Sequence, residues 1–261
     1  MPKITVPFNQ GWIKSKDNVV FSKELTKIIN FYVFGTPCEF TSSSGQTIRD
    51  RKWDKNTWKN PDLRTYLLSR AELLKGVTYA KATKLDEMTA LATTVGLSGN
   101  FQNNRGRNRI VFYDDKKTVN ILAIFYYIRC SFAHGRFQIY NNNTGENIYV
   151  LEAISKSRGK SDYIVKARMI LKESTLILWA NTIMGGENAF AEERKSMEKQ
   201  VQNYILEAIR NAPSLTKPKI VESVDYDDTI VYKQFKVLVS NGRISYDNRK
   251  KIWQCKKGQE K

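Results

Sequence analysis

The sequence holds few of the residues that build metal sites and disulfide frameworks: three cysteines and one histidine, His134, in 261 residues. Cys38, Cys130 and Cys255 lie far apart and lack metal-ligand spacing, so neither a zinc site nor a set of disulfides is predicted. The chain also has no Gly-rich phosphate loop, and we expect no bound cofactor or metal. These absences disfavour polymerase-like, kinase-like and metal-dependent nuclease chemistry.

Long apolar runs are missing as well. Arg129 interrupts the best candidate for a membrane span, and residues 1–17 have no apolar stretch of signal-peptide length. Together with the scarce cysteines, this predicts a soluble cytoplasmic protein in a reducing compartment, with no membrane partner.

Acidic residues are in short supply relative to basic ones: 26 Asp and Glu stand against 43 Lys and Arg, and the formal net charge is +17. Such an excess favours a phosphate-bearing partner, with nucleic acid preferred over a merely solvated basic surface. The length is sufficient for one larger and one smaller domain.

Helical spacing of apolar residues predicts four helices in the first half of the chain, over residues 23–34, 61–76, 79–95 and 116–134. Ser22 is a suitable N-terminal cap for the first of them. The last three would pack together as a bundle. This pattern predicts a mainly α-helical first domain.

The segment 96–109 is rich in Gly, Asn and Arg, which predicts an exposed loop. Arg105, Arg107 and Arg109 are candidate contacts to a nucleic-acid backbone. A solvated loop without a partner is the alternative reading of the same residues.

In the region after the central helix, residue types that favour β-structure alternate along the chain. Residues 148–155 and 163–170 read as a strand pair, residues 173–183 as a helix, and 185–195 as a linker. The predicted first domain, residues 1–185, is therefore a helical bundle with a small β-hairpin insertion.

The C-terminal segment, residues 196–261, has a different order of elements: three short helices and then a basic hairpin over residues 243–254. This order, and the sequence LVSNGRI between the last helix and the hairpin, resembles a winged helix-turn-helix module of small α+β type. The resemblance implies a domain that binds nucleic acid or a protein partner. The basic residues that we assign to phosphate contacts there are Lys233, Lys236, Arg243, Arg249, Lys250 and Lys251. A small helical cap with a solvated basic surface is the alternative.

The stretch from Lys116 to Phe137 is the longest apolar run, and its apolar residues surround the predicted helix on all sides. Within it lies the sequence Arg-Cys-Ser-Phe-Ala-His-Gly, residues 129–135. This sequence resembles the Arg-x4–6-His motif of HEPN (higher eukaryotes and prokaryotes nucleotide-binding) ribonucleases, down to the Ala-His-Gly ending. Family members often carry a polar residue after the arginine; here Cys130 follows, and Ser131 is the candidate for that polar contact.

The resemblance implies a HEPN-like bundle that pairs as a homodimer through the 116–134 helix. It also implies a metal-independent endoribonuclease of bacterial toxin–antitoxin or phage-defence systems, held in check or triggered by a protein partner. Histidine titrates in the range that proton transfer from an RNA 2′-hydroxyl requires, and arginine offers a fork of donors for the charged phosphorane. Arg129, Ser131 and His134 are thus the predicted catalytic residues, and Arg136 an additional RNA contact.

Three other interpretations remain. His134 is a residue type favoured near a helix C-terminus, with Arg129 reaching toward solvent, in which case the pair is structural. The chain would then be a non-catalytic DNA-binding regulator that works through its C-terminal domain. Alternatively, the bundle is an assembly module that holds RNA without cutting it.

Overall fold

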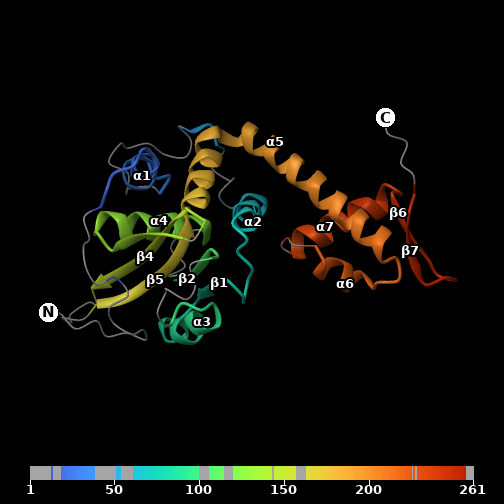
Figure 1. Ribbon diagram of the computed structural model, residues 1–261, viewed down its shortest axis with the longest axis horizontal. Coiled ribbons are helices and arrows are strands. Elements are labelled where there is room, and N and C mark those ends of the chain that lie inside the picture. The colour runs from blue at the N-terminus through green and yellow to red at the C-terminus, as the bar shows by residue number, and fades with distance from the viewer. Residues whose placement is uncertain are drawn as a thin grey trace. The chain divides into compact units, whose positions relative to one another are not determined.

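A five-stranded mixed β-sheet lies at the centre of the N-terminal part of the chain (Figure 1). The chain divides into two compact units, Met1–Glu187 and Asn188–Lys261. The computed structural model describes residues 13, 19–38, 51–53, 61–99, 106–114, 120–142, 144–156, 163–224, 226 and 228–256.

The strands of the sheet are rich in β-branched and aromatic residues, which favour extended backbone. They are β1 Tyr79–Ala82, β2 Arg109–Tyr113, β3 Phe137–Asn141, β4 Asn147–Lys156 and β5 Tyr163–Lys172. Their order is β1-β2-β5-β4-β3, with β1 parallel to β2 and every other neighbouring pair antiparallel. Four successive residues of β4, from Ile148 to Leu151, are fully buried, so both faces of the sheet are covered there.

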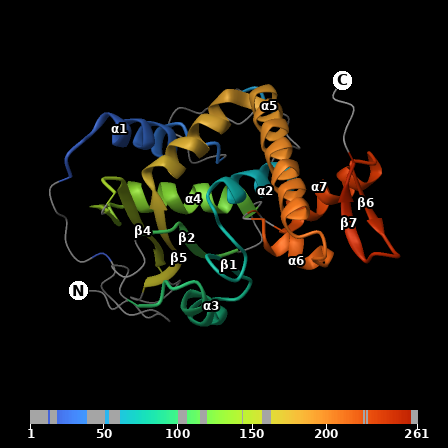
Figure 2. The ribbon, with the colours of Figure 1, turned by 45° about the vertical axis from the view of Figure 1, so that its right-hand side comes forward.

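Helices cover the two faces. They are α1 Lys23–Ile29, continued by a π-helical turn Asn30–Phe34, α2 Pro61–Arg70, a 3₁₀ turn Leu85–Glu87, α3 Met88–Thr94, α4 Asn120–Ala133 and α5 Glu173–Asn211. In both ribbon views α4 lies along one face of the sheet, with α1 beyond it, and α3 lies at the opposite face (Figure 2). The sheet with α3 and α4 therefore forms three layers.

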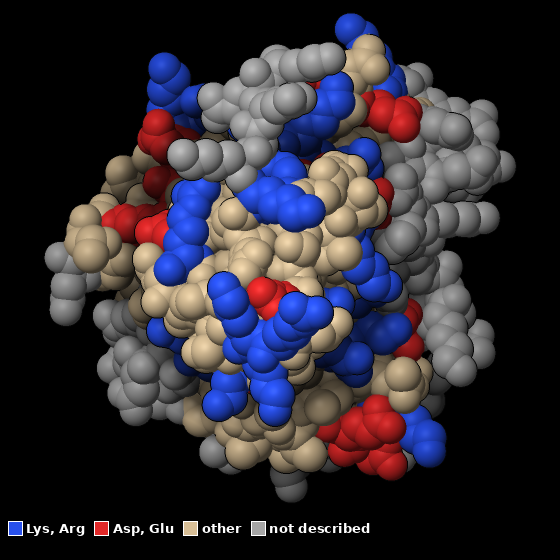
Figure 3. All heavy atoms as spheres, turned by 90° about the vertical axis from the view of Figure 1, so that its right-hand side faces the viewer, with Lys and Arg blue, Asp and Glu red and all other residues tan. Residues whose placement is uncertain are grey.

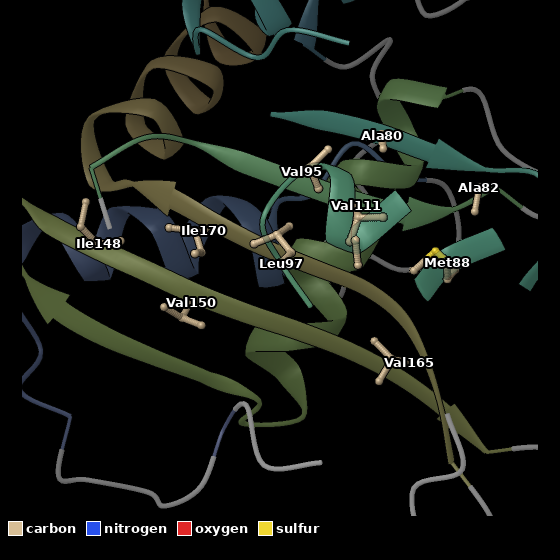
Figure 4. Close-up of a cluster of buried hydrophobic side chains, with 11 residues drawn as sticks. Ala80, Ala82, Met88, Val95, Leu97, Val111, Ile148, Val150, Val165 and Ile170 are labelled. Carbon is tan, nitrogen blue, oxygen red and sulfur yellow. The ribbon is translucent and has the colours of Figure 1, made fainter. Parts of the chain in front are cut away.

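The core on the α3 side is aliphatic. Met88 and Val95 lie against Val111, Val150 and Ile170 from three different strands (Figure 4). All five side chains are at most 1% exposed, so strands that are distant in sequence share one apolar layer. Burial of each such side chain is worth about 1.5–3 kcal/mol.

The core on the α4 side is aromatic. Phe125 of α4 stacks on Tyr32, with ring centroids 5.7 Å apart, and contacts Trp179 of α5 at 5.9 Å. The Trp179 indole donates a hydrogen bond to the Leu67 carbonyl of α2, and the Tyr32 hydroxyl donates to the Leu176 carbonyl of α5. α4 thus packs between the sheet, the π-helical turn that continues α1, and α5.

The prediction of a mainly helical, HEPN-like bundle with a small hairpin insertion is wrong, because the five-stranded sheet organises this unit. Residues 79–95 were predicted as one helix, but residues 79–82 pair with β2 and only Met88–Thr94 is α-helical. β2 and β3 were not predicted. β1 and β2 are stabilised by partners far away in sequence, which local spacing does not reveal, whereas β3 pairs with β4 directly after a short turn.

Other predicted elements are confirmed. The first helix begins after Ser22, whose hydroxyl accepts a hydrogen bond from the Leu25 amide. Residues 148–155 and 163–170 do form an antiparallel pair, β4 and β5, inside the larger sheet. The central helix is present from Asn120; residues 115–119 lie outside the described part of the chain.

The linker that was predicted over residues 185–195 is helical instead. α5 runs through it, with non-helical angles at Gly186, where φ is 79°. A Cβ at Gly186 would lie 2.9 Å from the Arg51 carbonyl oxygen, so glycine is required both for the backbone angle and for the close approach.

The C-terminal unit contains the end of α5, followed by α6 Lys217–Glu222, α7 Asp228–Ser240, and the antiparallel strands β6 Ile244–Asp247 and β7 Ile252–Cys255. The second and third of the predicted helices and the hairpin lie where the sequence predicts them, whereas the first, predicted to be short, is the end of the 39-residue α5. Ile220 and Val221 of α6 and Phe235 and Leu238 of α7 are buried, and form the core of this unit with apolar residues of α5.

The described helices include none that is both long enough and apolar enough to cross a membrane.

Candidate functional site

The residues of the Arg-x4-His motif lie on α4 and on the turn that follows it. Most side chains of α4 are buried, and its accessible stripe contains Leu122, Tyr126, Arg129 and Ala133, spaced by three or four residues. Arg129 is half-buried, and its Nε atom is buried without a hydrogen-bond partner in the described structure. The arginine thus lies on the partly accessible stripe of α4, where Cys38 contacts the Leu122 carbonyl.

His134 is exposed and follows the last helical residue. The helix ends because Gly135 adopts a positive φ of 62°, and the Arg136 amide donates a 2.8 Å hydrogen bond back to the Ser131 carbonyl. The chain then enters β3. The turn therefore places the histidine at the surface.

Ser131 lies on the opposite side of α4 from this accessible stripe. It is 1% exposed, and its hydroxyl donates a 2.8 Å hydrogen bond to the Tyr127 carbonyl one turn earlier. The structure therefore does not bring Ser131 together with Arg129 and His134 at the surface.

Two buried thiols lie next to Arg129. Burial raises the pKa of Cys38 to about 12 and also raises the pKa of Cys130, while the positive charge of Arg129 lowers both. Both cysteines are free thiols. Because burial dominates, Arg129 has neutral thiols rather than thiolates beside it.

The packing of α4 also bears on the predicted homodimer. The resemblance implied a homodimer through this helix, and its apolar residues on all sides fitted that expectation. Within one chain, however, the sheet, the π-helical turn that continues α1, and α5 already pack against it. Its composition therefore gives no support for a subunit interface.

Arg136, predicted as an RNA contact, is bonded to a buried carboxylate. Its guanidinium pairs with Glu152 of β4, and the other oxygen of Glu152 accepts a 3.0 Å hydrogen bond from Nε of Arg168 on β5. Glu152 and Arg168 are 2% and 1% exposed and lie opposite each other in the strand register. This network was not predicted, although a charge inside each of two apolar strands was a visible signal.

The three loop arginines have different environments. Arg107 is exposed, whereas Arg109 belongs to β2 and its Nη1 donates a 2.7 Å hydrogen bond to the Val95 carbonyl at the end of α3. Arg105 lies outside the described residues. The neighbouring Asn108 is buried and bonds to Ala71 and Thr175, so residues 108–113 belong to the folded core rather than to an open loop.

The exposed face of α7 is polar and basic. Thr229, Lys233, Lys236 and Ser240 are exposed at spacings of four, three and four residues, and Asp228 is the only acidic residue of the helix. The opposite face carries the buried residues Ile230, Val231, Gln234, Phe235 and Leu238. The helix is therefore held by its apolar side and presents two lysines to solvent.

The hairpin carries three consecutive basic residues at its tip, Arg249, Lys250 and Lys251, all exposed. The Asp247 carboxylate accepts hydrogen bonds from the Arg249 and Lys250 amides, which fixes the turn. Figure 3, which views the molecule from the side of this unit, shows Lys and Arg side chains gathered there.

Ring packing anchors the hairpin to α7. Trp253 of β7 contacts Phe235 of α7, with centroids 4.8 Å apart, and Tyr246 of β6 at 5.0 Å. Arg243 lies at the base of the hairpin, where its charge lowers the pKa of Cys255 against a larger effect of burial. The structure thus brings the α7 lysines and the hairpin cations into one unit, with Arg243 apart from the tip.

No cluster of three or more His, Cys, Asp and Glu side chains suited to a metal ion occurs in the part of the chain that the structure describes. No protein-family model, curated protein or solved structure matches the chain.

Proposed function

We propose that the protein binds double-stranded DNA through its C-terminal unit, with α7 in the major groove and the hairpin tip against the phosphate backbone. The observation that carries the proposal is the exposed face of α7, where Lys233 and Lys236 stand beside Thr229 and Ser240 on a helix anchored by its opposite side. A helix of this kind fits the major groove of B-DNA.

The hairpin supports the same function. Three adjacent cations on a turn fixed by Asp247 offer contacts to phosphates, and the ring packing of Trp253 on Phe235 joins the hairpin to α7. The cations of α7 and of the adjoining hairpin can therefore contact both the groove and the phosphate backbone of one duplex.

The ribonuclease interpretation remains a prediction. Arg129 and His134 both reach the surface, but the helical bundle from which that function was argued is replaced by a sheet-based unit, and Ser131 is buried. The residues of the C-terminal unit therefore give the stronger basis for a function.

The proposal is tested by fluorescence anisotropy with a labelled 30-base-pair duplex of mixed sequence at several KCl concentrations. We expect the double variant Arg249→Gln/Lys250→Gln to bind about tenfold more weakly, and the slope of log K against log salt to fall by about 2, since each phosphate contact contributes about 0.9. The double variant Lys233→Gln/Lys236→Gln, on the groove side, should lose a similar factor in affinity.

The matched control is Lys195→Gln/Lys199→Gln on α5, which removes the same charge from two exposed residues of the same unit. We expect this control to bind within about twofold of the wild type. An equal loss in control and test variants would show that only overall charge matters, and the absence of duplex binding by the wild type would overturn the proposal.

A further inference from the structure

All exposed residues of α7 but one are polar or charged. The exception is Val239, which is 45% exposed in the last turn of the helix, three residues after the exposed Lys236. Side chains three residues apart on a helix are neighbours, with their Cβ atoms about 5–6 Å apart. A lysine and a valine therefore form an adjacent pair on the helix that we assign to the DNA major groove.

The hairpin is fixed to the same half of α7. The Trp253 ring packs on Phe235, and the Arg243 amide donates a 2.9 Å hydrogen bond to the Leu238 carbonyl. Phe235 and Leu238 directly precede Lys236 and Val239 in sequence. The pair and the hairpin are therefore held together, and both can contact the same duplex.

Lys236 offers hydrogen-bond donors and no acceptor. Within the described part of the chain, neither an ion pair nor a hydrogen bond engages its ammonium group. In the major groove guanine presents two acceptors, O6 and N7, whereas adenine and cytosine each present an amino group that donates, and thymine has a single acceptor. The ammonium group of Lys236 therefore suits guanine best.

The side chains that would read adenine or cytosine are not exposed beside this pair. Adenine is read by Asn or Gln, and cytosine by Asp or Glu. The only amide side chain of α7, Gln234, is 2% exposed and accepts a 2.8 Å hydrogen bond from Gln202 of α5. The only carboxylate of α7, Asp228, is the first residue of the helix, about two turns before Lys236.

Val239 offers methyl groups where the rest of the exposed helix offers polar ones. Thymine is the DNA base that carries a methyl group in the major groove, and apolar side chains contact it there. Such a contact would remove part of the valine from water. Because neighbouring base pairs are only about 3.4 Å apart, the two side chains can reach adjacent base pairs.

We propose that α7 selects a guanine and a thymine on adjacent base pairs, with Lys236 donating to guanine O6 and N7 and Val239 contacting the thymine methyl group. This specificity rests on the proposed binding of duplex DNA and adds a sequence preference to it. A basic surface that contacts phosphates alone would hold all sequences alike.

Selection from a library of duplexes with about 20 random base pairs tests whether the preference exists. The full chain is incubated with the library at about 150 mM KCl, and the bound duplexes are sequenced. We expect the enriched sequences to share G and T on adjacent base pairs. Bound duplexes that share no such pair would overturn the specificity and leave the proposed function standing, whereas failure to retain any duplex would overturn both.

Replacement of the selected thymine by deoxyuridine removes only the methyl group. The wild type should bind the deoxyuridine duplex about fourfold more weakly, as expected for the loss of one methyl contact. Val239→Ser should bind the two duplexes equally. Val77→Ser, at a 53% exposed valine of the N-terminal unit, is the matched control and should keep the fourfold difference. No difference in the wild type, or a difference that persists in Val239→Ser, would contradict the assignment of Val239.

Replacement of the selected guanine by 7-deazaguanine removes the N7 acceptor and keeps the base pairing. Wild-type affinity should fall about fivefold, whereas Lys236→Gln should bind the two duplexes within about twofold of each other. Arg249→Gln, at the hairpin tip, should weaken both duplexes by the same factor and keep the fivefold difference, because phosphate contacts carry no sequence information. Circular dichroism of each variant confirms that the fold is retained. Equal sensitivity to 7-deazaguanine in the wild type and in Lys236→Gln would overturn the assignment of Lys236.

Discussion

At the scale of single residues, burial decides the chemistry of the side chains around the Arg-x4-His motif. Arg129 and His134 reach the surface because the stripe of α4 that carries the arginine is partly accessible and the histidine follows the helix end. Ser131, two positions after Arg129, turns into the core. The motif and its position on a helix were predictable from sequence, but which of its side chains face solvent depended on helices packed from elsewhere.

Cys38 gives a prediction about stability at high pH. Its pKa is raised from about 9 to about 12, chiefly because burial disfavours the thiolate. Between these values the folded chain keeps a proton that the unfolded chain loses, so the free energy of unfolding should fall as pH rises, by about 1.4 kcal/mol per pH unit for this group.

Urea denaturation at pH 9, 10 and 11 measures that slope. In Cys38→Ala the fall should be less steep by about the contribution of one group. Cys255→Ala, at a half-buried position, should change the slope less. Identical slopes in the wild type and Cys38→Ala would show that this thiol does not titrate differently on unfolding.

At the scale of secondary-structure elements, segments with a local sequence signal were predictable, whereas β1 and β2, which depend on partners distant in sequence, were not. β4 and β5 were found because each runs for ten residues with β-favouring side chains, and α1 because Ser22 marks its start. β1 has only four residues and exists by pairing with β2 across a gap of 26 residues, from 83 to 108. Local periodicity carries no information about such a partner.

The pairing of β4 with β5 yields a second prediction, because Glu152 and Arg168 are buried across from each other. Glu152→Leu leaves the Arg168 guanidinium buried without its carboxylate, and should destabilise the fold by about 3–5 kcal/mol. The double variant Glu152→Leu/Arg168→Met removes both of the fully buried charges, leaves only the 22% exposed Arg136 without its carboxylate, and should recover much of that loss.

Chemical denaturation at pH 7 compares the two variants with the wild type. Val150→Ala on the same face of β4 is a useful reference, because it removes apolar volume without stranding a charge. If the double variant were less stable than Glu152→Leu alone, the cost would come from lost packing or from the hydrogen bond between Arg168 and the Leu97 carbonyl, rather than from the unpaired charge.

At the scale of the whole molecule, the two compact units carry different candidate functions. The C-terminal unit presents the basic faces of α7 and the hairpin, whereas the Arg-x4-His motif belongs to the N-terminal unit. The order of elements in the C-terminal unit was predictable because each helix there has its own apolar face. The N-terminal fold was not, since its sheet joins strands from distant segments.

This division predicts that RNA cleavage and duplex binding, if both occur, respond to different substitutions. Under the ribonuclease interpretation, the wild type incubated with mixed cellular RNA and a chelator produces 2′,3′-cyclic phosphate ends, and His134→Ala does not, because the proton-transfer group is gone. His134→Ala should leave duplex affinity unchanged. Lys233→Gln/Lys236→Gln should weaken duplex binding and leave the RNA products unchanged.

Two outcomes would contradict the ribonuclease interpretation. If His134→Ala still cleaves RNA, His134 is not a catalytic residue. If the wild type leaves RNA intact but binds duplex DNA, the result favours a DNA-binding regulator in which Arg129 and His134 are structural.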